Sequence, residues 1–189
     1  MRLLLASKSP RRRELLGQLG VPLTFVDVNV EETLPDGIPV DMVAESLAIL
    51  KAEGFTGDIN DDEVLVTADT VVVLNSRVLG KPHGFTEASE MLHSLSGQVH
   101  QVYTGVCLRD ACRSVSFTER TDVHFRRLAD TEIDYYITHY KPFDKAGAYG
   151  IQEWIGMVGI ERIEGCYYNV MGLPLARLYR ELHALKDRR

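Results

Sequence analysis

The stretch VLVTADTVVVLNSRVL, residues 64–79, decides the fold that we expect for this chain. Its apolar run 64–68 predicts a buried strand, and segments 71–74 and 78–79 predict a hairpin around the turn Asn75-Ser76. A short turn joins only antiparallel strands, because parallel strands need a long crossover connection. The stretch therefore predicts a sheet that contains a hairpin, and it argues against an all-parallel sheet.

Helix and strand patterns continue on both sides of this hairpin. Val-, Thr-, Phe- and Tyr-rich segments at 99–109 and 114–126 predict paired strands. The segment Thr33–Pro39 carries two prolines and a glycine and predicts a surface loop. Apolar spacing with capping residues predicts helices over residues 10–20, 41–52, 86–97, 130–140 and 174–185. We expect an α/β fold with helices flanking a mixed, largely antiparallel central sheet.

Size and charge restrict the classes of protein to consider. The 189 residues fit a single domain, residues 1–189, with an ordinary hydrophobic fraction of 45%. The net charge of −6 argues against a nucleic-acid partner. Three cysteines without a CxxC pair, no secretory signal and no apolar run near membrane length predict a cytoplasmic protein without a membrane partner.

The stretch SKSPRRR, residues 7–13, is the clearest candidate for a ligand site. Ser9 is a favoured N-cap and Pro10 suits the first position of a helix. Three arginines follow in the first turn, where the helix dipole is already positive and each costs a few tenths to about 1 kcal/mol. Serine hydroxyls, free N–H groups and guanidinium groups together suit a phosphate. A solvated arginine cluster is the simpler alternative.

Four further charged residues are weaker candidates when each is taken alone. Asp69 directly follows the apolar run 64–68, where a carboxylate can hold a cation, accept a proton or simply form a turn. Lys51 lies near a helix end, which favours a lysine in any case. Lys81 is presented near the hairpin by Pro82, and Glu31 becomes a metal ligand only beside a second carboxylate such as Asp69.

The segment FDKAGAYGIQ, residues 143–152, combines small residues with Asp, Lys, Tyr and Gln. Such a loop lets a ligand approach the backbone, and the amide of Gln152 can both donate to and accept from a nucleobase edge. A plain glycine-rich connector is equally compatible with this pattern. No GxGxxG motif and no histidine pair with metal-ligand spacing occur in the sequence.

Taken together, the motifs resemble the Maf family of nucleoside triphosphate pyrophosphatases. The resemblance implies two lobes around a deep cleft, a fold similar to inosine triphosphate pyrophosphatases, and hydrolysis of a nucleoside triphosphate to monophosphate and pyrophosphate with a divalent cation, Mg²⁺ or Mn²⁺. The matching stretches run nearly end to end: LASKSPRR at 5–12, ADTVV at 68–72, GKP at 80–82, SGQVHQVYTG at 96–105, DKAGAYGIQ at 144–152 and GLP at 172–174.

The resemblance also implies roles for individual residues. Asp69 becomes the general base and, with Glu31, a metal ligand. Thr70 and Gln152 would read the base edge, and together with Arg12 they mark the branch of the family that acts on dTTP and UTP. The residues implied to bind the triphosphate are Ser7, Ser9, Arg11, Arg12, Lys51 and Lys81.

Two other functions stay open at this point. A nucleotide-sensing regulator of cell division would use the same cleft without hydrolysis, since the family name is associated with inhibition of septum formation. A pyrophosphatase for modified purine nucleotides is the enzymatic alternative. The sequence does not separate UTP from dTTP, and it is compatible with a homodimer.

Overall fold

The computed structural model describes residues 1–33 and 37–187. Within this part of the chain, one sheet has the strand order β2-β1-β3-β5-β6-β7, with β4 paired to β3. β1 is parallel to β2 and to β3, whereas β3 with β4 and β6 with β7 are antiparallel. The strands are β1 (Arg2–Leu5), β2 (Leu23–Phe25), β3 (Glu63–Leu74), β4 (Arg77–Leu79), β5 (Val99–Arg109), β6 (Ser114–Phe125) and β7 (Ile160–Glu164).

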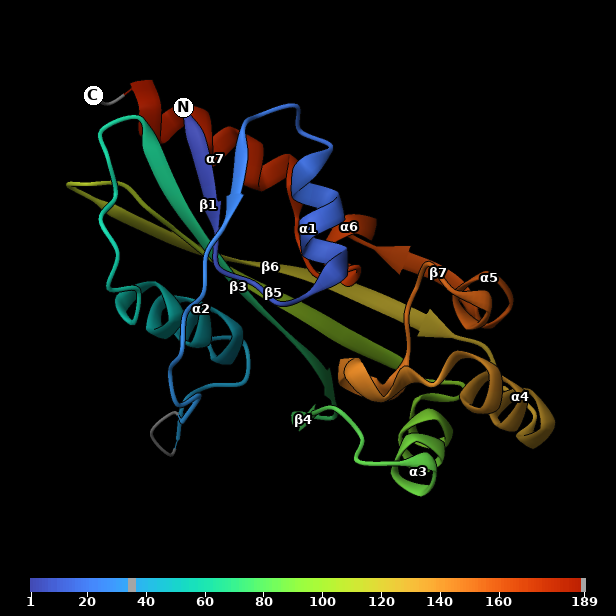
Figure 1. The fold of residues 1–189 in the computed structure, drawn as a ribbon. Helices are drawn as coiled ribbons and strands as arrows, with labels where there is room; N and C mark the ends of the chain where they lie inside the picture. Colours follow the sequence, from blue (N-terminus) through green and yellow to red (C-terminus); the bar gives the residue numbers. More distant parts are fainter. Residues whose placement is uncertain (34–36, 188–189) are drawn as a thin grey trace. The chain divides into compact units, whose positions relative to one another are not determined.

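Helices follow most strands along the chain and flank the sheet (Figure 1). The expected mixed α/β fold is therefore confirmed. None of the described helices is both long enough and apolar enough to cross a membrane. The helices are α1 (Pro10–Gly17), α2 (Val43–Glu53), α3 (Phe85–Leu95), α4 (Asp130–Tyr140), α5 (Trp154–Gly159), α6 (Tyr167–Val170) and α7 (Leu175–Asp187), with the 3-10 turns η1 (Pro142–Asp144) and η2 (Ala146–Ala148).

The chain divides into two compact units, each assembled from separate segments. Unit 1 comprises Met1–Asp69, Thr104–Glu119 and Gly172–Arg189, and unit 2 comprises Thr70–Tyr103 and Arg120–Met171. The chain thus passes from one unit to the other between Asp69 and Thr70, in the middle of β3. The predicted cleft between two lobes stays a prediction.

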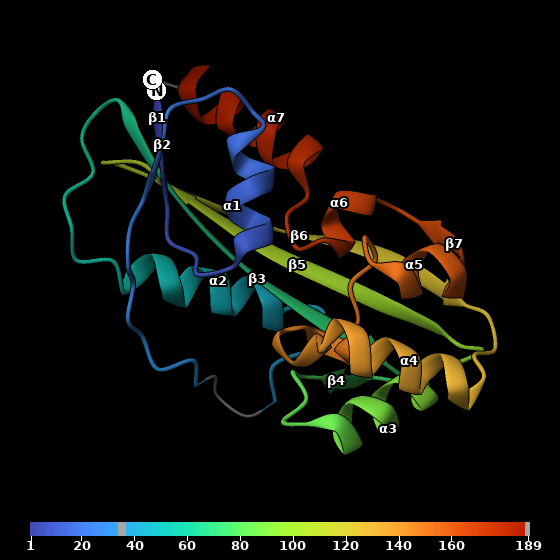
Figure 2. The same ribbon diagram turned by 45° about the vertical axis from the view of Figure 1, so that its right-hand side comes forward.

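Unit 1 packs helices on both faces of its strands (Figure 2). Leu4 of β1 packs in one cluster with Ala48 and Ala52 of α2. Because side chains alternate along a strand, Leu3 and Leu5 face the opposite side of the sheet. The cluster beneath α2 consists of Leu4, Ala6, Ala48, Ala52, Leu65 and Cys107, all buried. This packing fixes the helix that carries Lys51 against the strand that carries Asp69.

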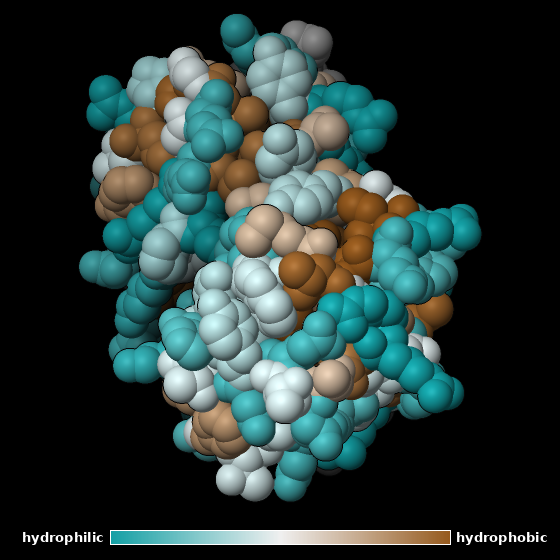
Figure 3. Space-filling view, turned by 90° about the vertical axis from the view of Figure 1, so that its right-hand side faces the viewer, coloured by the Kyte–Doolittle hydropathy of each residue, from teal (hydrophilic) through white to brown (hydrophobic). Residues whose placement is uncertain are grey.

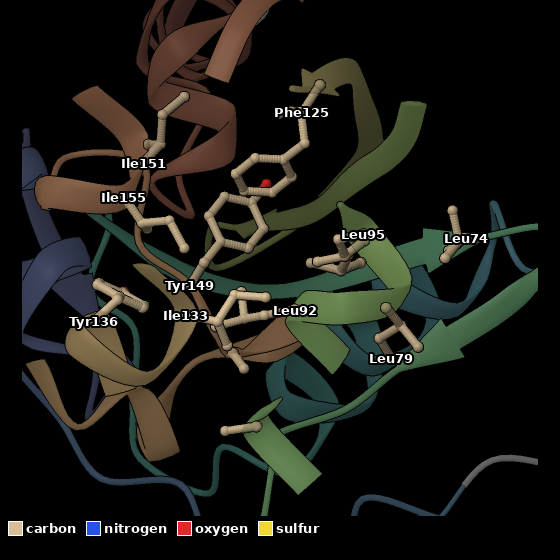
Figure 4. Packing of buried hydrophobic residues seen from close by; sticks show 14 of the residues in the cluster. Leu74, Leu79, Leu92, Leu95, Phe125, Ile133, Tyr136, Tyr149, Ile151 and Ile155 are labelled. Atoms are coloured by element: carbon tan, nitrogen blue, oxygen red, sulfur yellow. The ribbon is translucent and has the colours of Figure 1, made fainter. Parts of the chain in front are cut away.

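Unit 2 has its own hydrophobic core, drawn in Figure 4. Leu92 and Leu95 of α3, Ile133 and Tyr136 of α4, and Tyr149 meet there. Each is 5% exposed or less. On the outside, the face drawn in Figure 3 shows small hydrophobic patches between hydrophilic side chains. The core of unit 2 also includes Tyr149 and its neighbours Ala148 and Ile151, which belong to the segment 143–152 that we singled out from the sequence.

Several local predictions are confirmed to within a few residues. Ser9 is the N-cap of α1 and Pro10 its first residue, although the Ser9 side chain makes no capping hydrogen bond. The hairpin turn lies at Asn75 and Ser76, whose φ angles of 50° and 63° match a tight turn between twisted strands. The last helix begins at Leu175, one residue after Pro174.

Other local predictions need correction. Asp69 does not follow a strand but lies inside the continuous strand β3. α1 ends at Gly17 rather than near Gly20, and α3 begins at Phe85, with Gly84 rather than Thr86 as its N-cap. The predicted loop Thr33–Pro39 includes residues 34–36, which lie outside the described residues.

Candidate active site

The N-terminus of α1 has no acidic residue in its first turn, so the dipole meets only arginine side chains. Ser7 and Ser9 are linked locally, because the Ser9 N–H donates to the Ser7 hydroxyl at 3.2 Å. Arg13 is bound within the protein: its Nε donates to the Ser7 carbonyl at 3.0 Å, and its guanidinium lies 4.7 Å from the centre of the Phe25 ring. The three arginines are therefore not equivalent.

Arg12 reaches across unit 1 to two backbone carbonyls. Its Nε donates to Gly172 at 2.8 Å and its Nη1 to Ala68 at 2.9 Å. Burial lowers the pKa of the Arg12 guanidinium, an effect that the nearby Asp69 carboxylate opposes and the neighbouring Arg11 strengthens. Arg12 keeps its charge at any physiological pH, so Asp69 has a buried cation for a neighbour.

Lys51 contacts two carboxylates, those of Asp69 and Glu32. Both also stabilise the charge of Arg12. Its Nζ lies 2.6 Å from Asp69 Oδ1 and 3.2 Å from Glu32 Oε1. The side chains of Lys51 and Asp69 are 14% and 18% exposed, whereas Glu32 is 54% exposed. The structure thus brings Lys51 and Asp69, both predicted site residues, into direct contact.

α2 holds Lys51 in place through contacts along its length. Near the start of the helix, Glu45 accepts hydrogen bonds from Ser116 at 2.7 Å and Thr118 at 2.6 Å. In the middle, the Thr67 hydroxyl donates to the Ala48 carbonyl at 2.6 Å. The helix also lies directly on Gly105, where an added Cβ would stand 2.2 Å from the Glu45 nitrogen. Only glycine permits this close approach of backbone to backbone.

Glu31, the predicted metal ligand, bonds to a neighbouring residue of its own segment. Its Oε1 accepts a hydrogen bond from Thr33 at 3.2 Å. Glu32 is the residue that shares Lys51 with Asp69, and sequence reasoning missed it. Two adjacent glutamates in an irregular segment give no periodic signal for choosing between them. The assignment of Glu31 as a ligand stays a prediction.

The remaining predicted residues, Thr70, Lys81 and Gln152, belong to unit 2. Lys81 is exposed. The loop that carries it is tied to the second motif, since the Gly147 N–H donates to the Gly80 carbonyl at 3.0 Å. Gly147 has a φ of 68° and lies against Val72, where an added Cβ would approach to 3.1 Å. The glycine is thus required by both conformation and space.

A polar network underlies Gln152. Lys145, 9% exposed, pairs with Glu153 Oε1 at 3.1 Å and with Asp144 at 2.8 Å. The Tyr136 hydroxyl donates to Glu153 Oε2 and accepts from the Gly150 N–H at 3.0 Å. Burial, together with the adjacent Glu153, raises the pKa of Tyr136. The Gln152 Oε1 atom is buried and has no hydrogen-bond partner.

Beneath this network, His100 of β5 is fully buried between aromatic rings. Its Nε2 lies 2.7 Å from the Tyr149 hydroxyl, and its ring stacks on Phe125 with 5.4 Å between centres. Burial lowers the pKa of His100 to about 3, so the ring is neutral in the folded protein. Its role is to support Tyr149, which precedes Gln152 by three positions.

The comparisons with known proteins agree with the motifs. A family model described as "Maf-like protein" matches residues 2–185. The chain belongs to the Maf family. A relative named dTTP/UTP pyrophosphatase from Phocaeicola vulgatus is 49% identical over 97% of this Maf chain and 96% of its own. Another of the same name, from Parabacteroides distasonis, is 48% identical over 96% and 94%.

Solved structures resemble this Maf protein only distantly. A nucleoside-triphosphatase (dITP/XTP pyrophosphatase) of Mycobacterium abscessus gives a TM-score of 0.43 at 18% identity, covering 68% of this chain and 76% of its own. The Ham1 protein of Staphylococcus aureus gives 0.49 at 15% identity, covering 69% and 73%. At these scores the likeness carries no argument about fold or activity.

The donors of this Maf protein are compatible with a divalent cation. Among the residues that the structure describes, no group of three or more His, Cys, Asp or Glu side chains could hold a metal by itself. Mg²⁺ is commonly bound by one or two carboxylates plus substrate phosphates. Asp69 and Glu32, drawn to one ammonium group, supply such a pair. The donor set therefore fits a cation that binds together with a phosphorylated substrate.

Proposed function

We propose that this Maf protein hydrolyses dTTP and UTP to the nucleoside monophosphate and pyrophosphate. The observation that carries the proposal is the Lys51–Asp69–Glu32 cluster, a carboxylate pair around one cation beside the arginine-rich start of α1. The relatives that bear the name dTTP/UTP pyrophosphatase support the choice of substrate, since the similarity extends over nearly the whole of both chains. We also propose a cytoplasmic location, because dTTP and UTP would be met there.

In this proposal Asp69 is the general base. It takes a proton from the water whose oxygen attacks the α-phosphorus, and the bond between that phosphorus and the bridging oxygen of the β-phosphate breaks. Pyrophosphate leaves with the electron pair of the broken bond. Lys51 holds the Asp69 carboxylate in place before substrate arrives, as it does in the structure at 2.6 Å.

Charge on the phosphates needs compensation in the same place. Asp69 and Glu32 would hold Mg²⁺ or Mn²⁺, which supplies neutralisation of phosphate charge when bound. Arg11, with the N–H groups at the start of α1 and the hydroxyls of Ser7 and Ser9, would bind phosphate oxygens. Lys51 would turn its ammonium group toward the phosphates once a cation screens the carboxylates.

Gln152 would select the base. Its buried Oε1 lacks a partner, so an N–H donor there would satisfy an acceptor that is otherwise costly to bury. Uracil and thymine each carry one ring N–H between two carbonyl groups, which suits an amide that accepts and donates. Contacts of Thr70 and Lys81 with the nucleotide stay predictions, as does a homodimer. No observation favours the cell-division regulator or the modified-purine enzyme.

The test is pyrophosphate release by the purified full-length chain with Mg²⁺ or Mn²⁺ and a panel of triphosphates. We expect kcat/KM for dTTP and UTP to exceed that for purine triphosphates by about 10²-fold, which corresponds to the upper end of the cost, about 1–3 kcal/mol, of leaving one buried polar group unpaired. A chelator control and the Asp69→Asn variant exclude a contaminating phosphatase. Failure to release pyrophosphate from any triphosphate, or a preference for purines, would contradict the proposal.

A further inference from the structure

The carbonyl groups along one edge of β3 lose their backbone partners where β1 ends. Arg2 donates its N–H to the Asp62 carbonyl at 2.8 Å, and Ala6 donates to Val66 at 3.1 Å. Alternate carbonyls of a strand point to the same side, so the next acceptor on this edge is Ala68. β1 stops at Leu5 and the chain turns into α1, so no strand remains to serve that carbonyl.

Arg12 supplies the missing donor. Its Nη1 bonds to the Ala68 carbonyl at 2.9 Å, in the place that a residue of β1 would occupy if the strand continued. Asp69, the proposed general base, is the next residue of β3. The Arg12 side chain thus takes the place of β1 at Ala68. The backbone of β3 at this point sets the position of the Asp69 carboxylate.

A second anchor fixes the guanidinium itself. Arg12 Nε donates to the Gly172 carbonyl at 2.8 Å, in the turn that precedes α7. Gly172 has a φ of 112°, a conformation that glycine adopts with little strain. Because the guanidinium is planar and rigid, two bonds in different directions define its position in a way that a lysine cannot reproduce.

We propose that Arg12 is a positioning residue that fixes the backbone of β3 beside Asp69, rather than a ligand of the triphosphate. The inference rests on the proposed function in one respect, the role of Asp69 as base. The three arginines of the first turn of α1 then have different roles. Arg12 bonds to the backbone of β3, and Arg13 bonds to the Ser7 carbonyl and lies over the Phe25 ring. Arg11 binds phosphate.

Paired variants separate positioning from phosphate binding. Arg12→Met should lower kcat for dTTP by about 10²-fold, the effect of misplacing a catalytic group by about 1 Å. KM for dTTP and the inhibition constant of inorganic pyrophosphate should stay within about twofold, since no phosphate contact is lost. The matched control, Arg11→Met, should raise both constants and change kcat less. A general loss of structure would not produce this split.

Arg12→Lys tests the fork geometry while keeping the charge. We expect it to lose kcat nearly as far as Arg12→Met, because one ammonium group cannot reproduce the two fixed bonds. Wild-type kcat in Arg12→Lys would overturn the proposal. A rise in KM and in the pyrophosphate inhibition constant, with kcat preserved in Arg12→Met, would also overturn it.

A measurement on the wild-type protein keeps the proposal testable even where a variant does not fold. NMR of arginine side chains should show a protected Arg12 Nε–H that does not shift when inorganic pyrophosphate is added, while the Arg11 signal shifts. A pyrophosphate-dependent shift at Arg12 with none at Arg11 would refute the positioning role. If the wild type releases no pyrophosphate from dTTP, the proposed function fails, and this titration still decides the role of Arg12.

Discussion

The two units hold their lysine–carboxylate pairs by different additional contacts. In unit 1, Lys51, Asp69 and Glu32 pair across helix, strand and irregular segment while part of each side chain remains exposed. In unit 2, Lys145 and Glu153 pair at 9% and 19% exposure, close to the 14% and 18% of Lys51 and Asp69, but the Tyr136 hydroxyl also donates to Glu153. The first arrangement can exchange its partners for a ligand. The second is tied to its own segment, because the Tyr136 hydroxyl that donates to Glu153 also accepts from the Gly150 N–H.

This difference predicts separate consequences for chemistry and for recognition. Charges in unit 1 that are partly solvated can reorganise around phosphate and a cation at modest cost. In unit 2, the ion pair of Lys145 with Glu153 and the hydrogen bonds of Tyr136 to Glu153 and Gly150 tie the segment 144–153 together and make it rigid. We therefore expect substitutions in unit 1 to change turnover, and those in unit 2 to change stability and discrimination between bases.

The largest expected effect belongs to Asp69. Asp69→Asn should leave the fold intact, because the amide oxygen can still accept from Lys51, and should lower kcat by about 10²-fold or more, the contribution of a general base. Steady-state pyrophosphate release and a thermal melt measure both. Turnover near the wild-type value in a correctly folded variant would remove the base role from Asp69.

Gly105 tests how closely α2 packs against the sheet. A Cβ at Gly105 would stand 2.2–2.3 Å from backbone atoms of Ala44 and Glu45, so the helix must move. Gly105→Ala should reduce the free energy of unfolding by about 1–3 kcal/mol, the cost of overpacking. Gly17→Ala is a matched control, since nothing lies within 4 Å of its Cβ position. Equal stability of the two variants in urea unfolding would contradict the close contact.

Local features of this fold were predictable because their causes are local. Pro10 suits the first position of α1, and Asn75 tolerates the positive φ that this hairpin turn requires. The strand β7 is not predicted, because the two isoleucines of Ile160–Glu164 are three positions apart and do not alternate as in a strand. The sequence predicts the end of a strand at Asp69, because an aspartate after an apolar run is typical of a turn. Inside β3, its carboxylate accepts a hydrogen bond from Lys51, eighteen positions earlier, a contact that no local pattern indicates.

The candidate site was predictable as a set of residues but not as an arrangement. The arginine cluster, Lys51 and Asp69 stand out by motif, and the structure brings Lys51 and Asp69 together. The partners of Arg12 lie 56 and 160 positions away and are backbone carbonyls, which carry no signal in the sequence. The choice of Glu32 at Lys51 likewise depends on the path of an irregular segment.

The free energy of unfolding should fall in acid because of His100, which is buried in unit 2. Its pKa is about 3 in the folded protein and near 6.5 when unfolded, so below pH 6.5 the unfolded chain binds a proton that the folded protein refuses. Stability should therefore be full above pH 6.5 and fall by up to about 1.4 kcal/mol per pH unit toward pH 3. His100→Gln should remove this slope between pH 6.5 and 5 in urea unfolding. An unchanged slope would assign the acid sensitivity to other groups.

The smallest expected effect is that of a substitution at Glu153. It separates recognition of the base from binding of the phosphates. Glu153→Gln keeps an acceptor for Tyr136 but leaves the ammonium of Lys145 with only the exposed Asp144, at a cost of about 1 kcal/mol. Gln152 directly precedes Glu153, so we expect the loosened segment to weaken dTTP binding: a loss of about 1 kcal/mol in binding free energy would raise KM about fivefold, while inhibition by inorganic pyrophosphate stays unchanged. Pyrophosphate has no base, so it reports on the phosphate contacts alone. Parallel weakening of both ligands would place Glu153 in support of phosphate binding and erase the proposed division between the two units.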